Sequence, residues 1–358
     1  MRIVLLGLSI TSSWGNGHAT NYRALVRVLA ARGHDVLFLE RDAPWYAERR
    51  DLPVPPWGRT ELYRSLDELR ERFAEPVSEA DLVLVGSYVT EGVPVAEWVL
   101  DTVGGVAAFW DIDTPVTVEK LERGDDEYLS RALVPRFDVY LSFTGGPLLD
   151  RIRDEFGARD AQPFHCMADP EAYRRLDEDE RWLLGYLGTY SDDRQPAVES
   201  LLLEPARRLE HDRFVVAGPQ YPSAVSWPGN VERIEHLAPA EHPSFYARQR
   251  FTLNVTRAAM VDAGWSPSVR LFEAAACGVP AISDRWEGLD HFFRPGSEIL
   301  VADSDDDIVE VLSTLSRDEA RAIGAAARRR VLAEHTPARR AEELEALAHA
   351  RAGMRVTT

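Results

Sequence analysis

Cysteine is scarce in this chain, and long apolar runs are missing from it. Only Cys166 and Cys277 occur among the 358 residues, so the sequence can build neither a disulfide framework nor a multi-cysteine zinc site. The opening run MRIVLLGLSI is too short for a signal peptide or a membrane span, and polar residues follow it directly. We therefore expect a cytoplasmic protein that does not associate with membranes.

An excess of positive charge is also missing. The chain has 59 Asp and Glu against 41 Lys and Arg, a formal charge of −18. Such a surface repels phosphate polymers and anionic lipids, so we expect no nucleic-acid partner. The composition, with 45% hydrophobic and 28% charged residues, is that of a globular protein long enough for two domains.

Alternating strand and helix patterns predict an α/β domain in the first half of the chain. Arg2–Leu8 is an apolar run of strand length, a helix is expected near Thr20–Arg32, and Asp35–Leu39 reads as a second strand. This is a βαβ unit with a parallel strand pair. Residues 43–60 contain four prolines and two tryptophans and are expected to form an ordered surface loop. Further buried strands are expected at Leu82–Gly86, Val106–Trp110 and Val139–Phe143.

A second alternating series begins near Trp182 and predicts a second doubly wound sheet. The acidic stretch 168–180 reads as the linker, which gives an N-terminal domain over 1–168, a C-terminal domain over 169–335 and a last helical segment over 336–358. Strands are expected at Leu183–Leu187, Phe214–Ala217, Val231–Glu235, Phe251–Val255 and Val279–Ser283, and helices near Ala197–Leu209, Pro243–Gln249, Ser268–Cys277 and Pro337–Ala352.

The most informative stretch is Ser266 to Asp284, SPSVRLFEAAACGVPAISD. Ser266 suits an N-cap and Pro267 suits the first helical position, so a helix is predicted to start there. The N–H groups and dipole at a helix start hold phosphate, and Arg270 can add a charge-assisted contact. Ionised Glu273 only accepts hydrogen bonds, which suits the paired hydroxyls of a ribose. The stretch therefore predicts a nucleotide site.

This stretch resembles the donor-site motif of nucleotide-sugar glycosyltransferases of the GT-B fold, of the group 1 and spore-maturation-like bacterial type. The resemblance is specific over residues 183–304 and weaker over 1–45. It implies two Rossmann-like domains facing across a cleft, with a final helix that crosses back to the N-terminal domain. It also implies a UDP-, dTDP- or GDP-linked sugar whose pyrophosphate lies at Ser268, Val269 and Arg270 and whose ribose lies on Glu273, and a small-molecule or glycan acceptor. Retaining members usually carry a second acid eight residues before the ribose-binding Glu; here that residue is Trp265, so donor sugar and stereochemistry stay open.

The predicted strands of the second sheet end in small or polar residues, and ligands collect at that edge of open α/β sheets. Arg194 is the nearest further cation for a pyrophosphate. The resemblance places the nucleotide base beside the residues that follow the third strand. The full set of expected donor contacts comprises Gly188, Thr189, Tyr190, Arg194, Gly218, His236, Leu237, Asn254, Ser268, Val269, Arg270 and Glu273.

The loop after the first strand carries Trp14 and the run Gly15, Asn16, Gly17, His18. An acceptor hydroxyl has a high pKa, so His18 as a general base would help an inverting attack. Some inverting GT-B enzymes resemble this layout, with an Asp about a hundred residues later that orients the His. Asp111 is predicted to take that role, and Asp113 is a further loop contact; a role in packing or capping is an equal alternative for His18 and Asp111.

Other functions remain open. The glycines after the first strand, with Glu40 as a ribose ligand, resemble a dinucleotide fingerprint, although Thr20 stands where the third glycine belongs. A nucleotide-sugar 2-epimerase of the same fold would need no acceptor, and a non-catalytic binding protein would show no turnover. We expect no cofactor and no metal, because the acidic run Asp303–Asp307 lies too late and reads as a loop before a helix.

Overall fold

The computed structural model describes the backbone of residues 1–355 and the side chains of residues 1–351. The chain forms two compact units. Unit 1 comprises residues 1–165 together with the C-terminal segment from Pro337, and unit 2 comprises Cys166–Thr336. The chain thus leaves unit 1 at His165 rather than at residue 168, and the stretch expected as a linker belongs to unit 2.

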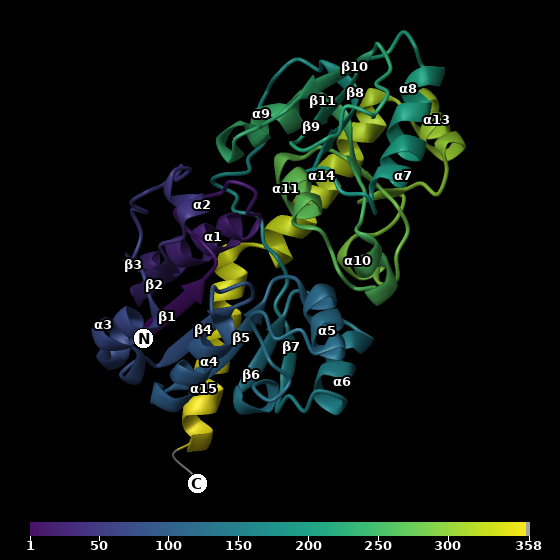
Figure 1. The fold of residues 1–358 in the computed structure, drawn as a ribbon. Helices are drawn as coiled ribbons and strands as arrows, with labels where there is room; N and C mark the ends of the chain where they lie inside the picture. The colour runs from purple at the N-terminus through teal and green to yellow at the C-terminus, as the bar shows by residue number, and fades with distance from the viewer. Residues whose placement is uncertain (356–358) are drawn as a thin grey trace. The chain divides into compact units, whose positions relative to one another are not determined.

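Unit 1 is built on a parallel sheet of the order β3-β2-β1-β4-β5-β6-β7 (Figure 1). Its central strands are buried throughout, as strands covered by helices on both faces must be. The strand order reverses between β1 and β4, which are paired in parallel. The strands are β1 (Arg2–Gly7), β2 (Asp35–Arg41), β3 (Arg59–Tyr63), β4 (Leu82–Gly86), β5 (Val106–Asp111), β6 (Val139–Ser142) and β7 (Ala161–Pro163).

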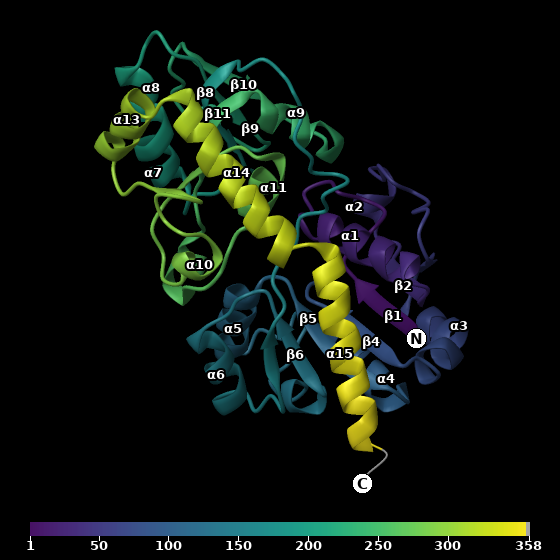
Figure 2. The same ribbon diagram turned by 180° about the vertical axis from the view of Figure 1, so that it is seen from behind.

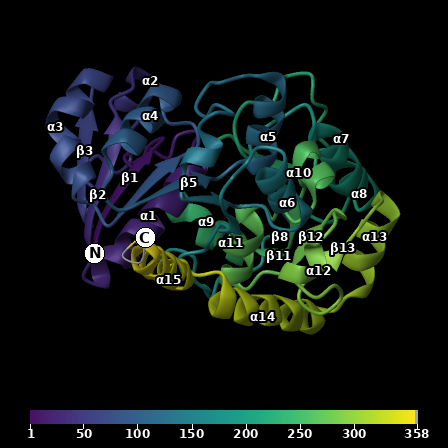
Figure 3. The same cartoon turned by 90° about the horizontal axis from the view of Figure 1, so that it is seen from below.

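Two groups of helices cover this sheet, with α1 and α15 on one face and α3 and α4 on the other (Figure 3). The C-terminal helix α15 is tied to the turn between α1 and β2, because Arg32 and His34 in this turn both bond to Glu345, at 2.6 and 2.7 Å. The helices of unit 1 are α1 (His18–Ala31), α2 (Pro44–Ala47), α3 (Leu66–Ser78), α4 (Gly92–Thr102), α5 (Thr114–Arg123), α6 (Pro147–Asp154) and α15 (Pro337–Arg355), with a 3₁₀ turn at Val134–Arg136.

Unit 2 repeats this architecture with the strand order β10-β9-β8-β11-β12-β13, again parallel. The order reverses between β8 and β11. The long helix α14 packs along α11 (Figure 2). The strands are β8 (Trp182–Leu187), β9 (Phe214–Ala217), β10 (Val231–Ile234), β11 (Gln249–Asn254), β12 (Ala281–Ser283) and β13 (Leu300–Val301). The helical segments are α7 (Gln195–Val198), a π turn (Glu199–Leu203), α8 (Glu204–Arg208), a 3₁₀ turn (Pro239–Glu241), α9 (His242–Ala247), α10 (Ala258–Ala263), α11 (Val269–Cys277), α12 (Leu289–Phe292), α13 (Asp305–Thr314) and α14 (Arg317–Glu334).

The predicted α/β fold of two doubly wound sheets is confirmed, and the corrections are local. Residues 43–60 hold helix α2 and the start of the edge strand β3 in addition to loop. The helix expected from Ser266 begins at Val269 with Ser268 as its N-cap, because the chain is still extended at Ser268, with φ −64° and ψ 139°. The acidic run 303–307 enters α13, where Ser304 caps the helix and accepts a hydrogen bond from the backbone N–H of Asp307.

Candidate functional site

The reversal of strand order in unit 2 lies between β8 and β11, and ligands of open α/β sheets bind beyond the carboxyl ends of strands at such a point. Arg270, in the first turn of α11, spans this point. Its Nε donates to the carbonyl oxygen of Leu187 at the end of β8, and its Nη1 donates to Oδ1 of Asn254 at the end of β11, at 3.1 Å. The guanidinium carbon also lies 5.0 Å from the ring centre of Tyr186. Arg270 is therefore held in one orientation at the switch point.

Arg194 is a second cation at this edge. Its Nη2 donates to the carbonyl oxygen of Thr189 at 2.7 Å and its Nε to Oγ of Ser191 at 2.8 Å. Burial lowers the pKa of Arg194, and the nearby charge of Arg270 lowers it further. Within the described residues, neither arginine has an ion-pair partner. Asp193 and Asp284 are near enough for their charges to act on Arg194 and Arg270, but neither forms an ion pair with them. Two partly buried cations without an ion-pair partner are a candidate site for an anion.

The N-terminus of α11 adds backbone donors at the same place. The side chain of Ser268, the N-cap, makes no capping hydrogen bond. The first N–H groups of a helix have no partner inside the helix, and they favour a phosphate where no side chain caps them. At its other end α11 stops at Gly278 in the left-handed region, with φ 80°, as the sequence predicts.

Glu273 lies on the buried side of α11, with 5% of its surface exposed. Burial raises the pKa of Tyr173, and the nearby charge of Glu273 raises it further. The hydroxyl of Tyr173 lies 3.2 Å from Nδ1 of His242, whose pKa is lowered by burial. Sequence reasoning missed Tyr173 and His242, because Tyr173 falls in the stretch that reads as a linker.

Two glycines allow the loops after β8 and β9 to come together. A Cβ at Gly188 would lie 2.5 Å from the hydroxyl of Tyr186. A Cβ at Gly218, which has φ 142°, would lie 2.0 Å from the carbonyl oxygen of Gly188. Tyr190 bonds to Pro219 through its N–H group and to Asp192 through its hydroxyl. Gly218 is therefore required by the close approach of the two backbones, and Gly188 by the Tyr186 side chain that packs against it.

The remaining expected donor residues differ in their surroundings. Asn254 is buried, and its amide donates to Thr256 and Ser283, so it fixes the carbonyl that holds Arg270. His236 is exposed after β10, and Leu237 next to it is half-buried. Trp265, eight residues before Glu273, has a left-handed backbone with φ 50° and packs against Gly288.

In unit 1 the strand order reverses between β1 and β4. Hydrogen bonds within the loop after β1 fix its conformation. The buried side chain of Asn16 donates to the carbonyl oxygens of Ser9 and Ser12 and accepts from the N–H of His18 at 3.0 Å. Gly15 has φ 60°, and both Gly15 and Gly17 are exposed. The loop therefore presents His18 at the first residue of α1.

Glu40, at the end of β2, excludes the dinucleotide alternative. Its fully buried carboxylate accepts four hydrogen bonds, from Oγ of Ser9, the N–H of Ile10 and both the N–H and Oγ1 of Thr11. Both carboxylate oxygens are thus engaged by the loop after β1, and neither is available for a ribose. Glu40 organises the loop that carries His18.

The structure does not form the predicted dyad of His18 and Asp111. Asp111 is fully buried and accepts hydrogen bonds from the hydroxyls of Tyr140 and Thr117 and from the N–H of Asp113. Within the described part of the chain, Nδ1 of His18 has no hydrogen-bond partner. The prediction that Asp111 orients His18 is therefore wrong, because tyrosine and threonine side chains from β6 and α5 reach the carboxylate instead.

Burial shifts the pKa values of His18 and Asp111 in opposite directions. It lowers the pKa of His18 to about 4, so the imidazole is neutral near pH 7, and the same shift makes it a weaker base than a free histidine. Burial also raises the pKa of Asp111 to about 6, against the hydrogen bonds that it accepts.

Tyr88, in the loop after β4, is a neighbour of His18 that sequence reasoning missed. Its ring centre lies 5.6 Å from that of His18, edge to face, and its backbone is left-handed with φ 62°. Its hydroxyl donates to Oδ2 of Asp113 at 2.9 Å. Because β4 and β1 are neighbouring strands, these loops meet at the switch point of unit 1.

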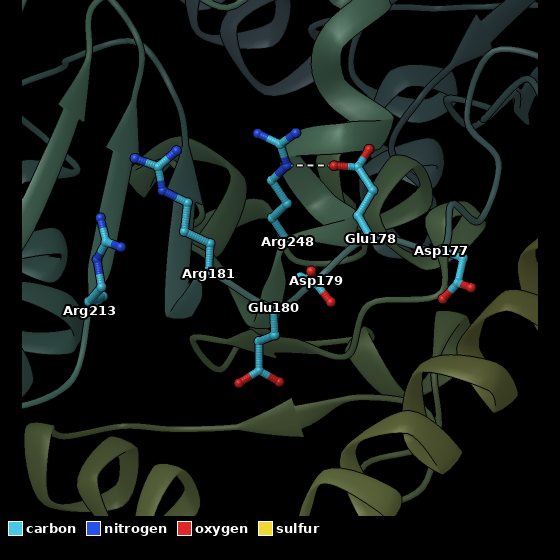
Figure 4. A pocket seen from close by; sticks show the side chains of 7 residues that line it. All are labelled: Asp177, Glu178, Asp179, Glu180, Arg181, Arg213 and Arg248. Carbon is cyan, nitrogen blue, oxygen red and sulfur yellow. Dashed lines mark hydrogen bonds and ion pairs between the residues drawn. The ribbon is translucent and has the colours of Figure 1, made fainter.

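Unit 2 also has a cavity of about 800 Å³, which is distinct from the anion site at Arg194 and Arg270 (Figure 4). Arg181, Arg213 and Arg248 line it, and each directly precedes a strand, so the cavity lies at the amino ends of β8, β9 and β11. Its charges are largely paired, Glu178 with Arg248 and Arg181 with Glu232. This edge is opposite to the one where ligands of such sheets bind.

Among the described residues, no three His, Cys, Asp or Glu side chains come together in a way that could hold a metal ion. Among residues 1–355, no helix has both the length and the apolar character that crossing a membrane requires.

Comparisons with known proteins agree with the fold. Residues 194–346 match the family model described as "Glycosyl transferase-like". Sucrose-phosphate synthase from Thermosynechococcus elongatus is similar in structure, with a TM-score of 0.70, 15% identity and coverage of 97% of this chain and 98% of that one. HepE of Anabaena, solved with UDP and glucose, has a TM-score of 0.71, 12% identity and coverage of 97% and 99%. An alpha-glucosyltransferase solved with UDP-glucose and DNA has a TM-score of 0.67, 12% identity and coverage of 97% and 98%. No curated protein sequence matches the chain.

The two doubly wound units define a protein of the GT-B fold. The matched segment, which contains Arg194, Arg270 and Glu273, is glycosyltransferase-like.

Proposed function

We propose that the protein transfers a sugar from a nucleotide-diphosphate sugar to a hydroxyl-bearing acceptor without a metal ion. The observation that carries the proposal is the pair Arg194 and Arg270, two cations without ion-pair partners among the described residues, beside the uncapped N-terminus of α11. A diphosphate is an anion of suitable charge for this site. In this arrangement, Glu273 binds the ribose, and the residues after β9 and β10 flank the base.

The fixed orientation of Arg194 and Arg270 supports a mechanism without a metal ion. As the bond between sugar and diphosphate breaks, negative charge grows on the leaving group, and fixed donors that already point there stabilise it. Arg270 is held by Leu187 and Asn254, and Arg194 by Thr189 and Ser191, so neither must reorganise during the reaction. UDP-glucose is the first donor to test, because HepE and the alpha-glucosyltransferase were solved with it.

In the acceptor step, His18 acts as the general base. Its imidazole is neutral at working pH and its Nδ1 has no hydrogen-bond partner within the described residues. Tyr88 packs on its ring and limits its orientation. A base that accepts the acceptor proton favours an inverting attack.

The test is a calorimetric titration of the protein with UDP and UDP-glucose, followed by turnover assays with a panel of acceptors in the presence of EDTA. We expect binding of both ligands and chelator-resistant transfer. Turnover of UDP-glucose without any acceptor into an epimer would favour the epimerase, and loss of transfer in EDTA with recovery in Mg²⁺ or Mn²⁺ would overturn the metal-free mechanism.

A further inference from the structure

Trp14, four residues before His18, is one of three large hydrophobic residues in the described chain that are markedly exposed. Its side chain is 43% exposed. The guanidinium carbon of Arg49 lies only 3.6 Å from the centre of its ring. Within the described residues, the Arg49 side chain makes no hydrogen bond and no ion pair. An indole and an unpaired cation thus form one exposed surface, which we call the Trp14–Arg49 surface.

This surface is rigidly supported from beneath. Ser12 donates through Oγ to the carbonyl oxygen of Arg49 at 2.7 Å, and the N–H of Leu52 donates to the carbonyl oxygen of Thr11. These bonds join the loop after β1 to the segment after α2. Glu40 fixes the same loop from the other side, as described above. A tryptophan in a flexible loop would lose conformational entropy on binding a ligand, whereas the loop that carries Trp14 is already ordered.

Asp51 completes the support. It accepts two hydrogen bonds from Ser13, at 2.8 and 2.9 Å, and a bidentate pair from Arg23 of α1. Although burial opposes it, the hydrogen bonds from Arg23 and Ser13 lower the pKa of Asp51 to about 2. Asp51 is therefore ionised at any working pH, and its charge is used by Arg23 rather than by Arg49.

We propose that the Trp14–Arg49 surface binds the acceptor and selects a sugar ring that carries a carboxylate. This inference rests on the proposed function, because an acceptor is needed only if a sugar is transferred. The C–H face of a pyranose ring is apolar and buries well against an indole, and a carboxylate pairs with a guanidinium. Arg49 covers part of the indole, so the sugar packs against the part of Trp14 that remains exposed, with its carboxylate at the adjacent guanidinium.

Position and charge support the assignment. Trp14 lies four positions before His18, so their Cα atoms are at most about 15 Å apart, and a bound acceptor can reach the base. The formal charge of −18 repels anions from most of the surface. An unpaired arginine beside this loop provides a local exception, which favours an anionic acceptor at this place.

The test uses two probes that differ only in the group of interest, methyl β-D-glucuronide and methyl β-D-glucoside. Both are titrated by NMR into the full-length protein saturated with UDP. We expect the glucuronide to bind about two- to fivefold more tightly, the scale of an exposed ion pair. Arg49→Gln should remove this difference, and Trp14→Ala should weaken both probes about three- to tenfold, with partial recovery in Trp14→Phe.

Trp45→Ala is the matched control. Trp45 is more exposed than Trp14, at 53%, and packs against Tyr46 without a stacked cation. It should leave both affinities unchanged. Equal binding of the two probes by the wild type, or equal losses in Trp14→Ala and Trp45→Ala, would overturn the inference. UDP affinity measured on the same samples separates the two proposals: retained UDP binding with no preference rejects the acceptor surface alone, and failure of the wild type to bind UDP rejects the proposed function.

Discussion

Replacement of Arg270 by Gln tests the anion site most directly. Arg270 touches the ends of both switch-point strands and has no ion-pair partner among the described residues, so its charge is available to a diphosphate. A hydrogen bond to a charged group contributes about 1.5–3 kcal/mol, which corresponds to a rise of roughly 10- to 150-fold in the dissociation constant of UDP.

Uridine is the internal control for this variant, because it shares the base and ribose of UDP and lacks the phosphates. We expect the affinity for uridine to change little, since the lost contact exists only where phosphate is present. The variant also leaves the carbonyl oxygen of Leu187 and Oδ1 of Asn254 without this donor, at a cost of about 1–3 kcal/mol in unfolding free energy if glutamine does not replace it. Urea unfolding measures this cost separately.

Calorimetry of wild type, Arg270→Gln and Arg270→Lys with both ligands, at one fixed ionic strength, decides the question. Arg270→Lys keeps the charge and should recover part of the UDP affinity while losing the fixed orientation of the guanidinium. Equal losses for uridine and UDP would show that Arg270 supports the local fold and does not bind phosphate. An unchanged UDP affinity in Arg270→Gln would remove it from the donor site.

The remaining predictions concern three other groups. Glu273→Gln should weaken UDP and uridine alike, by roughly ten- to 150-fold, and should have a smaller effect on 2′,3′-dideoxyuridine; the same loss for the dideoxy ligand would show that Glu273 does not bind ribose. His18→Ala should lower turnover about 10²–10⁴-fold with UDP affinity unchanged, and near-normal turnover would reject the general base and favour a retaining reaction. Because the folded-state pKa of Asp111 is raised from 3.8 to about 6, the native state binds the extra proton, and this contribution to stability is lost as pH rises from 4 to 6. Between pH 4 and 6, the unfolding free energy of Asp111→Asn, measured in urea, should therefore rise relative to that of the wild type. A constant difference between the two free energies would contradict the raised pKa of Asp111.

Much of the fold could be predicted because its signals are local. Buried parallel strands are short apolar runs, and the βαβ order follows from their alternation with helical patterns. The start of α11 was misplaced by two to three residues, because Ser266 and Ser268 are both good N-caps and only the backbone conformation distinguishes them. The edge strand β3 was missed because it lies on a proline-rich segment and is only partly buried, so it lacks the apolar run.

Local patterns in the sequence are enough to predict the class of protein. The residues that define the donor motif, from Ser268 to Gly278, are nearly consecutive, and a single helix brings them to the edge of the sheet. The glycosyltransferase interpretation and the GT-B fold, both confirmed by the comparisons, follow from this local pattern and from the two alternating series.

Contacts between side chains that are far apart in the sequence could be established only from the folded molecule. Tyr173 reaches Glu273 from a hundred residues away, Glu40 binds the loop after β1 instead of a ribose, and Asp111 is surrounded by hydroxyls rather than by His18. The contact between Trp14 and Arg49 is likewise a contact between distant segments of the chain. Hydrophobic periodicity and capping residues depend on a residue's position within its own helix or strand. The contacts named here depend instead on how separate segments pack and on which polar groups become hydrogen-bond partners of buried groups.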